Sequence, residues 1–249
     1  MSDQLRDKIA IVTGGGSGIG RAIALGFAAE GASVAVTDRD GGRAEAVATE
    51  ITAAGGTATG FATDVSVTID VDAMVERTVD QFGRLDILVN NAGRVGYGWV
   101  TNMTDETWDG VFDVNVRGTF ACSRAALGHM IPQRSGRILN TASGAGLRPF
   151  PRGAVYGASK AAIISLTYSL AEEVAKYGIT VNAIGPGPTD TPFWRAQRPE
   201  EDVAAAFEAG QVGQPEDFVA VVIFLCSDAG AAHSGVMVNR HTFVLGAQT

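Results

Sequence analysis

The sequence contains few residues that could bind a metal or form a disulfide. Its 249 residues include two cysteines and three histidines. Cys122 and Cys226 stand far apart in helical patterns, so we interpret them as small, reduced core residues of a cytoplasmic protein, where disulfides are unusual. His129, His233 and His241 show no ligand spacing, and we therefore expect no metal site.

Basic charge and long apolar runs are also scarce. The chain carries 19 Lys and Arg against 27 Asp and Glu, a formal net charge of -8, which disfavours a nucleic-acid partner. No apolar run is long enough to span a bilayer, and residues 1–8 are polar, without an apolar signal-peptide core. These features disfavour a nucleic-acid partner and a membrane span, and we expect a cytoplasmic protein.

Strand and helix patterns alternate along the chain. Apolar, β-rich runs occupy 8–13, 33–37, 57–62, 86–89, 136–142, 180–184 and part of 235–244, and helical patterns occupy 21–30, 68–82, 104–130, 155–177, 201–210 and 215–227. This alternation predicts an α/β fold, a doubly wound (Rossmann) parallel sheet of about seven strands with helices on both faces. The length suits one domain, 1–249, with a small substrate lid at about 190–212.

A glycine-rich turn, Gly14–Gly20, joins the first strand to the first helix. Glycines let a backbone approach a pyrophosphate closely, and a helix N-terminus offers free N–H groups and a positive dipole end. An ordinary βα turn is the alternative. The position of the turn at the start of an alternating chain favours a phosphate-binding loop.

The second predicted strand ends at Asp38, eighteen residues after Gly20. An acid at about this offset binds the ribose hydroxyls of adenosine. Its charge would repel a 2′-phosphate, which favours NAD over NADP. Arg39 is a contrary signal, because a guanidinium could pair with that phosphate, so NADP stays as the less favoured cofactor.

Tyr156 and Lys160 lie four residues apart in a predicted helix, so their side chains are neighbours on one face. A free phenol has a pKa near ~10, and an adjacent positive charge lowers that pKa. Such a pair can exchange a proton near neutral pH. Ser143 ends the strand pattern at 136–142 and is expected to face this helix. By themselves, Tyr and Lys at this spacing more often form a solvated helix edge.

Together these motifs resemble the short-chain dehydrogenase/reductase family of the compact single-domain kind. The resemblance covers nearly the whole chain, in the family's motif order. It implies a catalytic tetrad of Asn115, Ser143, Tyr156 and Lys160. It also implies cofactor contacts at Gly14, Ser17, Gly18, Ile19, Gly20, Asp38, Arg39, Asp64, Val65, Asn91, Ala92, Gly93, Tyr156, Lys160, Pro186, Gly187, Thr189 and Thr191.

The resemblance further implies NAD-dependent hydride transfer between nicotinamide and a secondary alcohol or ketone. Tyr156 would exchange the hydroxyl proton, and Lys160 would lower the pKa of Tyr156 and bind the nicotinamide ribose. Ser143 would hold the substrate oxygen. Asn115 would lie near Lys160 and relay the proton through a water. A non-redox lyase or dehalogenase and a non-catalytic dinucleotide sensor remain alternatives, against which the intact glycine loop and tetrad weigh.

The sequence gives less information about the oligomeric state and the substrate. The predicted helices at 104–130 and 155–177 are more apolar than one sheet face requires, and the family implies that they pair in a homotetramer. Residues 239–242 replace the family's usual Asp-Gly-Gly turn, so a dimer is the alternative. The substrate and direction stay open, as does whether an anionic substrate group is bound by the loop arginines Arg148, Arg152, Arg195 and Arg198.

Overall fold

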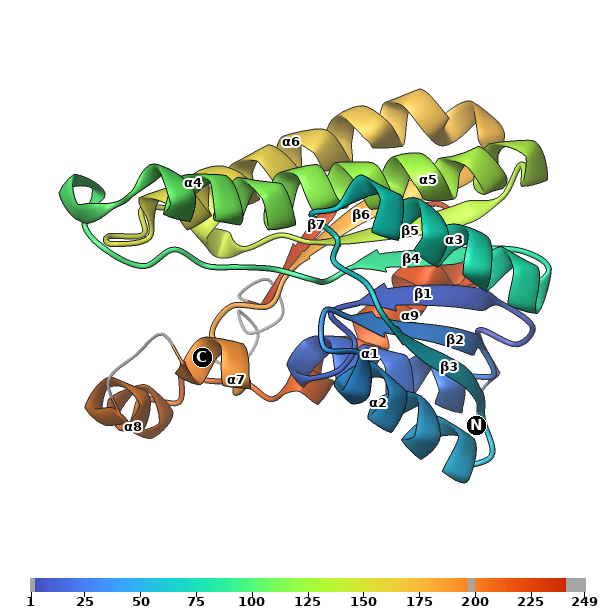
Figure 1. The fold of residues 1–249 in the computed structure, drawn as a ribbon, viewed down its shortest axis with the longest axis horizontal. Coiled ribbons are helices and arrows are strands. Elements are labelled where there is room, and N and C mark those ends of the chain that lie inside the picture. Colours follow the sequence, from blue (N-terminus) through green and yellow to red (C-terminus); the bar gives the residue numbers. More distant parts are fainter. Residues whose placement is uncertain (1–2, 197–199, 241–249) are drawn as a thin grey trace, which may run out of the picture.

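A computed structural model, which describes residues 3–196 and 200–240, contains one seven-stranded parallel sheet (Figure 1). The strand order is β3-β2-β1-β4-β5-β6-β7. The strands are β1 (Ile9–Thr13), β2 (Ser33–Asp38), β3 (Thr57–Ala62), β4 (Ile87–Asn90), β5 (Gly136–Thr141), β6 (Ile179–Gly185) and β7 (Met237–Asn239). The order reverses between β1 and β4, where open α/β sheets bind ligands at the carboxyl ends of their strands. The predicted doubly wound α/β fold is confirmed.

Helices cover both faces of the sheet (Figure 1). One face carries α1 (Gly18–Ala29), α2 (Gly41–Ala53) and α9 (Val219–Cys226), and the other carries α3 (Thr68–Phe82), α5 (Gly118–Gln133) and α6 (Ala154–Val174). The short helices are α4 (Asp105–Phe112), α7 (Pro192–Arg195) and α8 (Glu200–Glu208). Strands buried on both faces explain why their sequences are continuously apolar rather than alternating.

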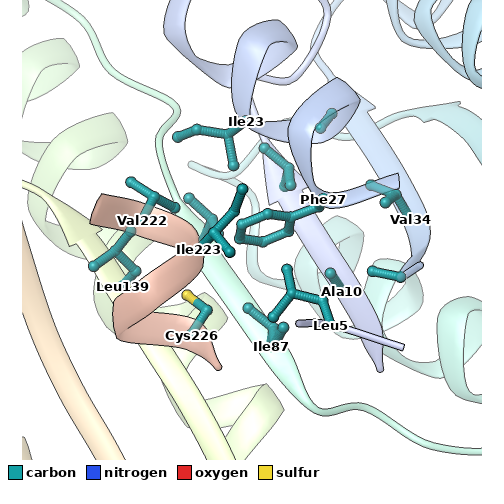
Figure 2. Close-up of a cluster of buried hydrophobic side chains, with 14 of the residues drawn as sticks. Leu5, Ala10, Ile23, Phe27, Val34, Ile87, Leu139, Val222, Ile223 and Cys226 are labelled. Atoms are coloured by element: carbon teal, nitrogen blue, oxygen red, sulfur yellow. The ribbon is translucent and has the colours of Figure 1, made fainter. Parts of the chain in front are cut away.

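The core below the sheet forms where α1 packs against α9 (Figure 2). Phe27 and Ile23 of α1 meet Ile223 of α9, and all three are at most 7 % exposed. Val34 of β2 and Ile87 of β4 belong to the same cluster. This packing fixes α1 against the first strands and so holds the glycine turn that precedes the helix.

The structure corrects two of the expectations about helices. The single helix expected at 104–130 is interrupted by a π-helical turn, Asp113–Arg117, between α4 and α5. Helix α2 was absent from the predicted elements, because its buried face is small and weakly apolar and because Asp38 to Gly41 indicated only a turn. In the structure the carboxylate of Asp40 caps α2 by accepting hydrogen bonds from the backbone N–H groups of Gly42 and Arg43.

The C-terminal expectations are partly tested. Strand β7 lies within the predicted 235–244 segment, but 241–244 fall outside the described residues. The predicted lid at 190–212 contains α7 and α8, while 197–199, including Arg198, lie outside them. Within the described ranges, no helix is both long and apolar enough to cross a membrane.

Candidate active site

A cavity of about 970 Å³ opens at the carboxyl ends of the central strands. Its wall includes all but two of the residues predicted to bind cofactor or to act in catalysis. Those in the wall are Gly14, Ser17, Gly18, Ile19, Asp38, Arg39, Asp64, Val65, Asn91, Ala92, Gly93, Ser143, Tyr156, Lys160, Pro186, Gly187, Thr189 and Thr191. The two exceptions, Gly20 and Asn115, lie behind the wall and support it.

The glycine turn has backbone conformations and approaches that side chains would obstruct. Gly14 and Gly18 have φ values of 61° and 52°, in the left-handed region. A Cβ on Gly20 would lie 2.2 Å from the carbonyl oxygen of Gly14 and 2.5 Å from Nδ2 of Asn91. The turn is therefore shaped to bring backbone N–H groups up to a ligand, and the residues present fit a dinucleotide pyrophosphate.

Asn91 braces this turn from the adjacent strand end. Its Nδ2 donates to the carbonyl oxygens of Thr13 and Gly14, each at 3.1 Å. The hydroxyl of Thr13 in turn accepts from the backbone N–H groups of Asn91 and Ala92, each at 3.1 Å, and donates to the carbonyl of Val89. The predicted cofactor contact at Asn91 is thus also a structural brace that fixes the phosphate loop.

Asp38 lies half-buried at the end of β2, beside the glycine turn. Its carboxylate accepts from the backbone N–H groups of Gly16 at 3.2 Å and Asp40 at 3.1 Å. Arg39 is exposed, and Arg43 of α2 also lines the cavity here. Sequence reasoning missed Arg43, because α2 itself was not predicted.

Within the described ranges, Lys160 is the one lysine in the cavity wall, and only 3 % of it is exposed. Its Nζ donates to the carbonyl of Thr141 at 2.6 Å and lies 5.5 Å from the ring centroid of Tyr156. Burial lowers the pKa of Lys160 to about 8, because a low-dielectric surrounding disfavours the ammonium form. The predicted neighbours on α6 therefore meet, with the amine poised to change charge near neutral pH.

Ser143 follows β5, as its sequence position indicated. Its hydroxyl accepts from the backbone N–H of Ala145 at 3.2 Å, which caps the short turn Gly144–Gly146. The ring of Phe150 approaches Tyr156 edge-on, with 6.2 Å between centroids. The serine, the phenol and an apolar ring thus border the same part of the cavity.

Asn115 lies at the π-helical turn and is fully buried. Its side chain accepts from the backbone N–H of Arg94 at 2.7 Å and donates to the Arg94 carbonyl and to Ser159 Oγ, each at 2.9 Å. Ser159 Oγ donates to the carbonyl of Tyr156 at 2.7 Å. Asn115 is thereby tied to the segment before α4 and to the first turn of α6. Sequence reasoning missed Arg94 and Ser159, which no motif marked.

The carbonyl of Asn115 accepts a hydrogen bond from the hydroxyl of Thr119 at 2.7 Å. A Cβ built on Gly93 would lie 3.6 Å from Asn115 Oδ1 and 3.9 Å from Lys160 Nζ, so both side chains lie close to Gly93. Asn115 is therefore near Lys160, as expected, but its amide group holds protein groups rather than facing the cavity.

Arg240, directly after β7, lies at the neck of the lid, which we define as the two segments 188–189 and 211–213 on either side of α7 and α8. Its Nη1 donates to the carbonyls of Pro188 at 2.9 Å and Gln211 at 3.3 Å, and its Nη2 lies 3.8 Å from Asp217 Oδ2. An isolated parallel bridge between Thr189 and Gly213 joins the same two segments of the neck. The guanidinium thus joins both ends of the lid to the start of the last helical segment.

Of the loop arginines singled out from the sequence, the described ones have different partners. Arg195 forms a two-contact ion pair with Asp190, and the guanidinium of Arg152 lies 4.6 Å from the ring centroid of Tyr97. Arg148 lines the cavity. In residues 3–196 and 200–240, no three His, Cys, Asp or Glu side chains are grouped to hold a metal ion.

The fold and this cavity define a dinucleotide-binding α/β protein, and comparison with known proteins gives its family. Residues 8–202 match the short chain dehydrogenase family. The chain therefore belongs to that family, and its predicted membership is confirmed. The family uses nicotinamide cofactors, and the named relatives below are dehydrogenases and reductases, which supports an oxidoreductase.

Full-length similarities agree with this assignment. The chain is 36% identical over 253 residues to the (2S)-[(R)-hydroxy(phenyl)methyl]succinyl-CoA dehydrogenase subunit BbsD of Thauera aromatica, which covers 98% of each chain. It is 38% identical to a 3-oxoacyl-[acyl-carrier-protein] reductase of Synechocystis sp., over 92% of this chain and 93% of that protein. A crystal structure of a short-chain type dehydrogenase/reductase from Mycobacterium marinum superposes with a TM-score of 0.89 at 33% identity, covering 96% and 95% of the two chains.

Proposed function

We propose that this protein is an NAD-dependent oxidoreductase that transfers a hydride between nicotinamide and a secondary alcohol or ketone. One observation carries the proposal: Ser143, Tyr156 and Lys160 border the same cavity as the glycine turn and Asp38. The bound nicotinamide would accept or donate the hydride. We further propose that residues 1–249 form one cytoplasmic domain with a substrate lid at about 190–212.

The residues around the cavity would divide the proton chemistry among them. Tyr156 takes the hydroxyl proton during oxidation and returns it during reduction. The ammonium of Lys160, 5.5 Å from the phenol ring centroid, favours the phenolate and binds the nicotinamide ribose. The hydroxyl of Ser143 holds the substrate oxygen and stabilises charge that develops there.

Asn115 would act from behind the cavity. By binding both backbone polar groups of Arg94 and the hydroxyl of Ser159, it holds the segment after Gly93 against the turn of α6 that carries Tyr156. We also propose that the backbone carbonyl of Asn115 binds the water that relays the proton. The hydrogen bond from Thr119 uses one lone pair of that oxygen and leaves the second for a water.

NAD is the proposed cofactor because the carboxylate of Asp38 stands where the adenosine ribose would bind. The backbone N–H groups of Gly16 and Asp40 hold this carboxylate in place. A 2′-phosphate would meet its negative charge. Arg39 and Arg43, which also line this end, are the groups that would favour NADP instead.

We also propose a homo-oligomer, with a tetramer favoured and a dimer as the alternative. Phe120 of α5 and Tyr168 of α6 are 46% and 47% exposed on the helices that the family implies should pair. A second, C-terminal interface would complete a tetramer. Light scattering at micromolar concentration tests this: a monomeric mass contradicts the helix pairing, and a dimeric mass implicates the altered C-terminal segment.

The function is tested by following NADH absorbance with a panel of secondary alcohols and ketones, in both directions. We expect reduction of NAD by at least one alcohol class and oxidation of NADH by the matching ketone. Transfer of deuterium from a carbinol-deuterated alcohol to the nicotinamide would identify direct hydride transfer. Tight NAD binding without any turnover would favour the sensor alternative, and product formation without change in NAD would favour a lyase or dehalogenase.

A further inference from the structure

The partners of the arginine side chains divide them into two groups. Most described guanidiniums contact a carboxylate, an aromatic ring or a backbone carbonyl, as Arg21 does with Glu50 and Arg77 does with the ring of Phe61. Among the described residues, the guanidiniums without such a contact are those of Arg39, Arg94 and Arg148, and all three line the cavity.

Two of these arginines flank the proposed reaction centre. The Nη2 of Arg148 lies 3.3 Å from a Cβ built on Gly144, the residue after Ser143. Arg94 follows Gly93, whose own Cβ position is 3.9 Å from Lys160 Nζ. Asn115 fixes the backbone of Arg94 at both its N–H and its carbonyl, and the Arg94 guanidinium lies against Gly110 of α4, where a built Cβ would be 2.4 Å from Nη1.

The electrostatic setting makes these two guanidiniums unusual. The chain has 27 acidic residues and a net charge of -8, yet among the residues that the structure describes only two acidic side chains, Asp38 and Asp64, line the cavity. Both carboxylates already accept hydrogen bonds, Asp38 from Gly16 and Asp64 from Ser66. The end that holds Ser143 is therefore positively charged and has no acidic side chain in its wall.

We propose that the substrate is a hydroxy or oxo compound that carries an anionic group, a carboxylate or a phosphate, which Arg148 binds with assistance from Arg94. A guanidinium binds either anion through two parallel N–H···O bonds, which fixes orientation as well as position. The anion would hold the carbinol carbon between Ser143 and Tyr156. This inference rests on the proposed function and specifies its substrate class.

The test compares related hydroxy compounds whose end groups are either anionic or neutral. A short 3-hydroxy acid, its methyl ester and the corresponding hydroxyalkyl phosphate are assayed with wild type, Arg148→Gln, Arg148→Lys and Arg94→Gln. Wild type should show kcat/KM at least tenfold higher for one of the two anions than for the ester. Arg148→Gln should remove that preference through KM, Arg148→Lys should restore part of it, and Arg94→Gln should have a smaller effect.

Arg134→Gln is the matched control, because Arg134 lies before the amino end of β5, at the opposite end of the strands from the cavity, and donates to the carbonyl of Lys176. It should leave the preference unchanged. Equal kcat/KM for acid, phosphate and ester, or an equal loss on all three in Arg148→Gln, would overturn the proposal. A loss of NADH affinity in Arg94→Gln without loss of the anion preference would assign Arg94 to the cofactor and leave Arg148 alone.

A binding measurement separates this inference from the proposed function. Calorimetry of the NAD complex with butyrate, butyl phosphate and butyramide requires no turnover. Binding of either anion but not the amide, lost in Arg148→Gln, supports the anion site even if no alcohol is oxidised. Turnover of neutral alcohols without selective anion binding supports the proposed function and rejects the anion site.

Discussion

The two ends of the cavity are built from different materials. At the glycine-turn end, the wall is mostly backbone and small residues, and Thr13, Asn91 and Asp38 are hydrogen-bonded to it. At the other end, the wall includes large side chains on loops and on the short helix α7, such as Arg148, Phe150 and the 43% exposed Phe193.

This difference determines how each end can change. A surface formed by close-packed backbone depends on the absence of Cβ atoms, so a single methyl group can close it. A surface formed by long side chains can alter its charge and shape without moving the sheet. One end can therefore keep a constant cofactor while the other end changes its substrate. Substitutions at each end test this contrast, and the largest effect is expected at the proposed reaction centre between the two ends.

Tyr156→Phe should have the largest effect, because it removes the proposed proton-transferring hydroxyl and keeps the ring that packs near Phe150. We expect kcat to fall by about 10²–10⁴-fold with nearly unchanged cofactor affinity. Steady-state kinetics and NADH titration measure the two separately. A variant that keeps most of its turnover would refute the acid–base role.

Lys160→Met should abolish most activity while raising stability at neutral pH. Burial lowers the pKa of Lys160 to about 8, so the folded state carries a desolvation cost while the side chain is in its ammonium form. That cost is fully present below about pH 8, shrinks as pH rises toward the unfolded value near 10.5, and then vanishes. We expect a gain of roughly 1–3 kcal/mol at pH 7, reduced by the lost hydrogen bond to Thr141.

Denaturant titrations from pH 7 to pH 10.5 measure this gain. Lys176→Met is the control, because Lys176 is exposed and lies over the ring of Tyr177. The difference in unfolding free energy between Lys176→Met and wild type should stay constant across this pH range. A Lys160→Met protein that is less stable than wild type at pH 7, or whose gain grows with pH, would contradict the electrostatic explanation.

Gly20→Ala tests the backbone-built end. The added methyl group would lie 2.2 Å from the Gly14 carbonyl and must displace the turn, at a cost of roughly 1–3 kcal/mol. We expect cofactor affinity to fall by about 10–100-fold. Gly128→Ala is the control, since nothing lies within 4 Å of that Cβ position on α5. Unchanged cofactor affinity in Gly20→Ala would show that the turn yields.

The same contrast explains how much the sequence could predict. The fold and the glycine-turn end were predictable, because glycine runs, strand ends and an acid at a fixed offset are local signals. Helix α2 was missed because its buried face is small and weakly apolar, with two alanines among its four buried residues, and Arg43 was missed with it. The bond from Asn115 to Ser159 and the bond from Arg240 to Pro188 join residues 44 and 52 positions apart, and no local pattern encodes such contacts.

Asp38→Asn addresses cofactor choice with a smaller effect. Wild type should bind NAD at least tenfold more tightly than NADP, a difference of roughly 1.4 kcal/mol. The amide oxygen can still accept a hydrogen bond from Gly16, so the substitution removes mainly the charge. We expect the preference to shrink toward equality in titrations with both cofactors. Equal or tighter NADP binding by wild type would contradict the assignment and point to Arg39.

Arg240→Gln should have the smallest effect and should act on the side-chain-built end alone. The guanidinium joins Pro188 and Gln211 across the neck of the lid, so its loss should loosen the lid while the glycine turn, braced by Asn91, stays intact. We expect KM for the alcohol to rise by roughly three- to tenfold, about 1 kcal/mol, with NAD affinity nearly unchanged.

Arg240→Lys should recover part of the loss, because an ammonium can donate to one of the two carbonyls but cannot span both in a planar fork. Lys8→Gln is the control. The ion pair of Lys8 with Asp228 also joins distant residues, but Lys8 lies before the amino end of β1, at the opposite end of the strands from the cavity. If Arg240→Gln weakened NAD binding as much as it raised KM, the two ends of the cavity would be mechanically coupled. The neck of the lid would then belong to the cofactor site as well.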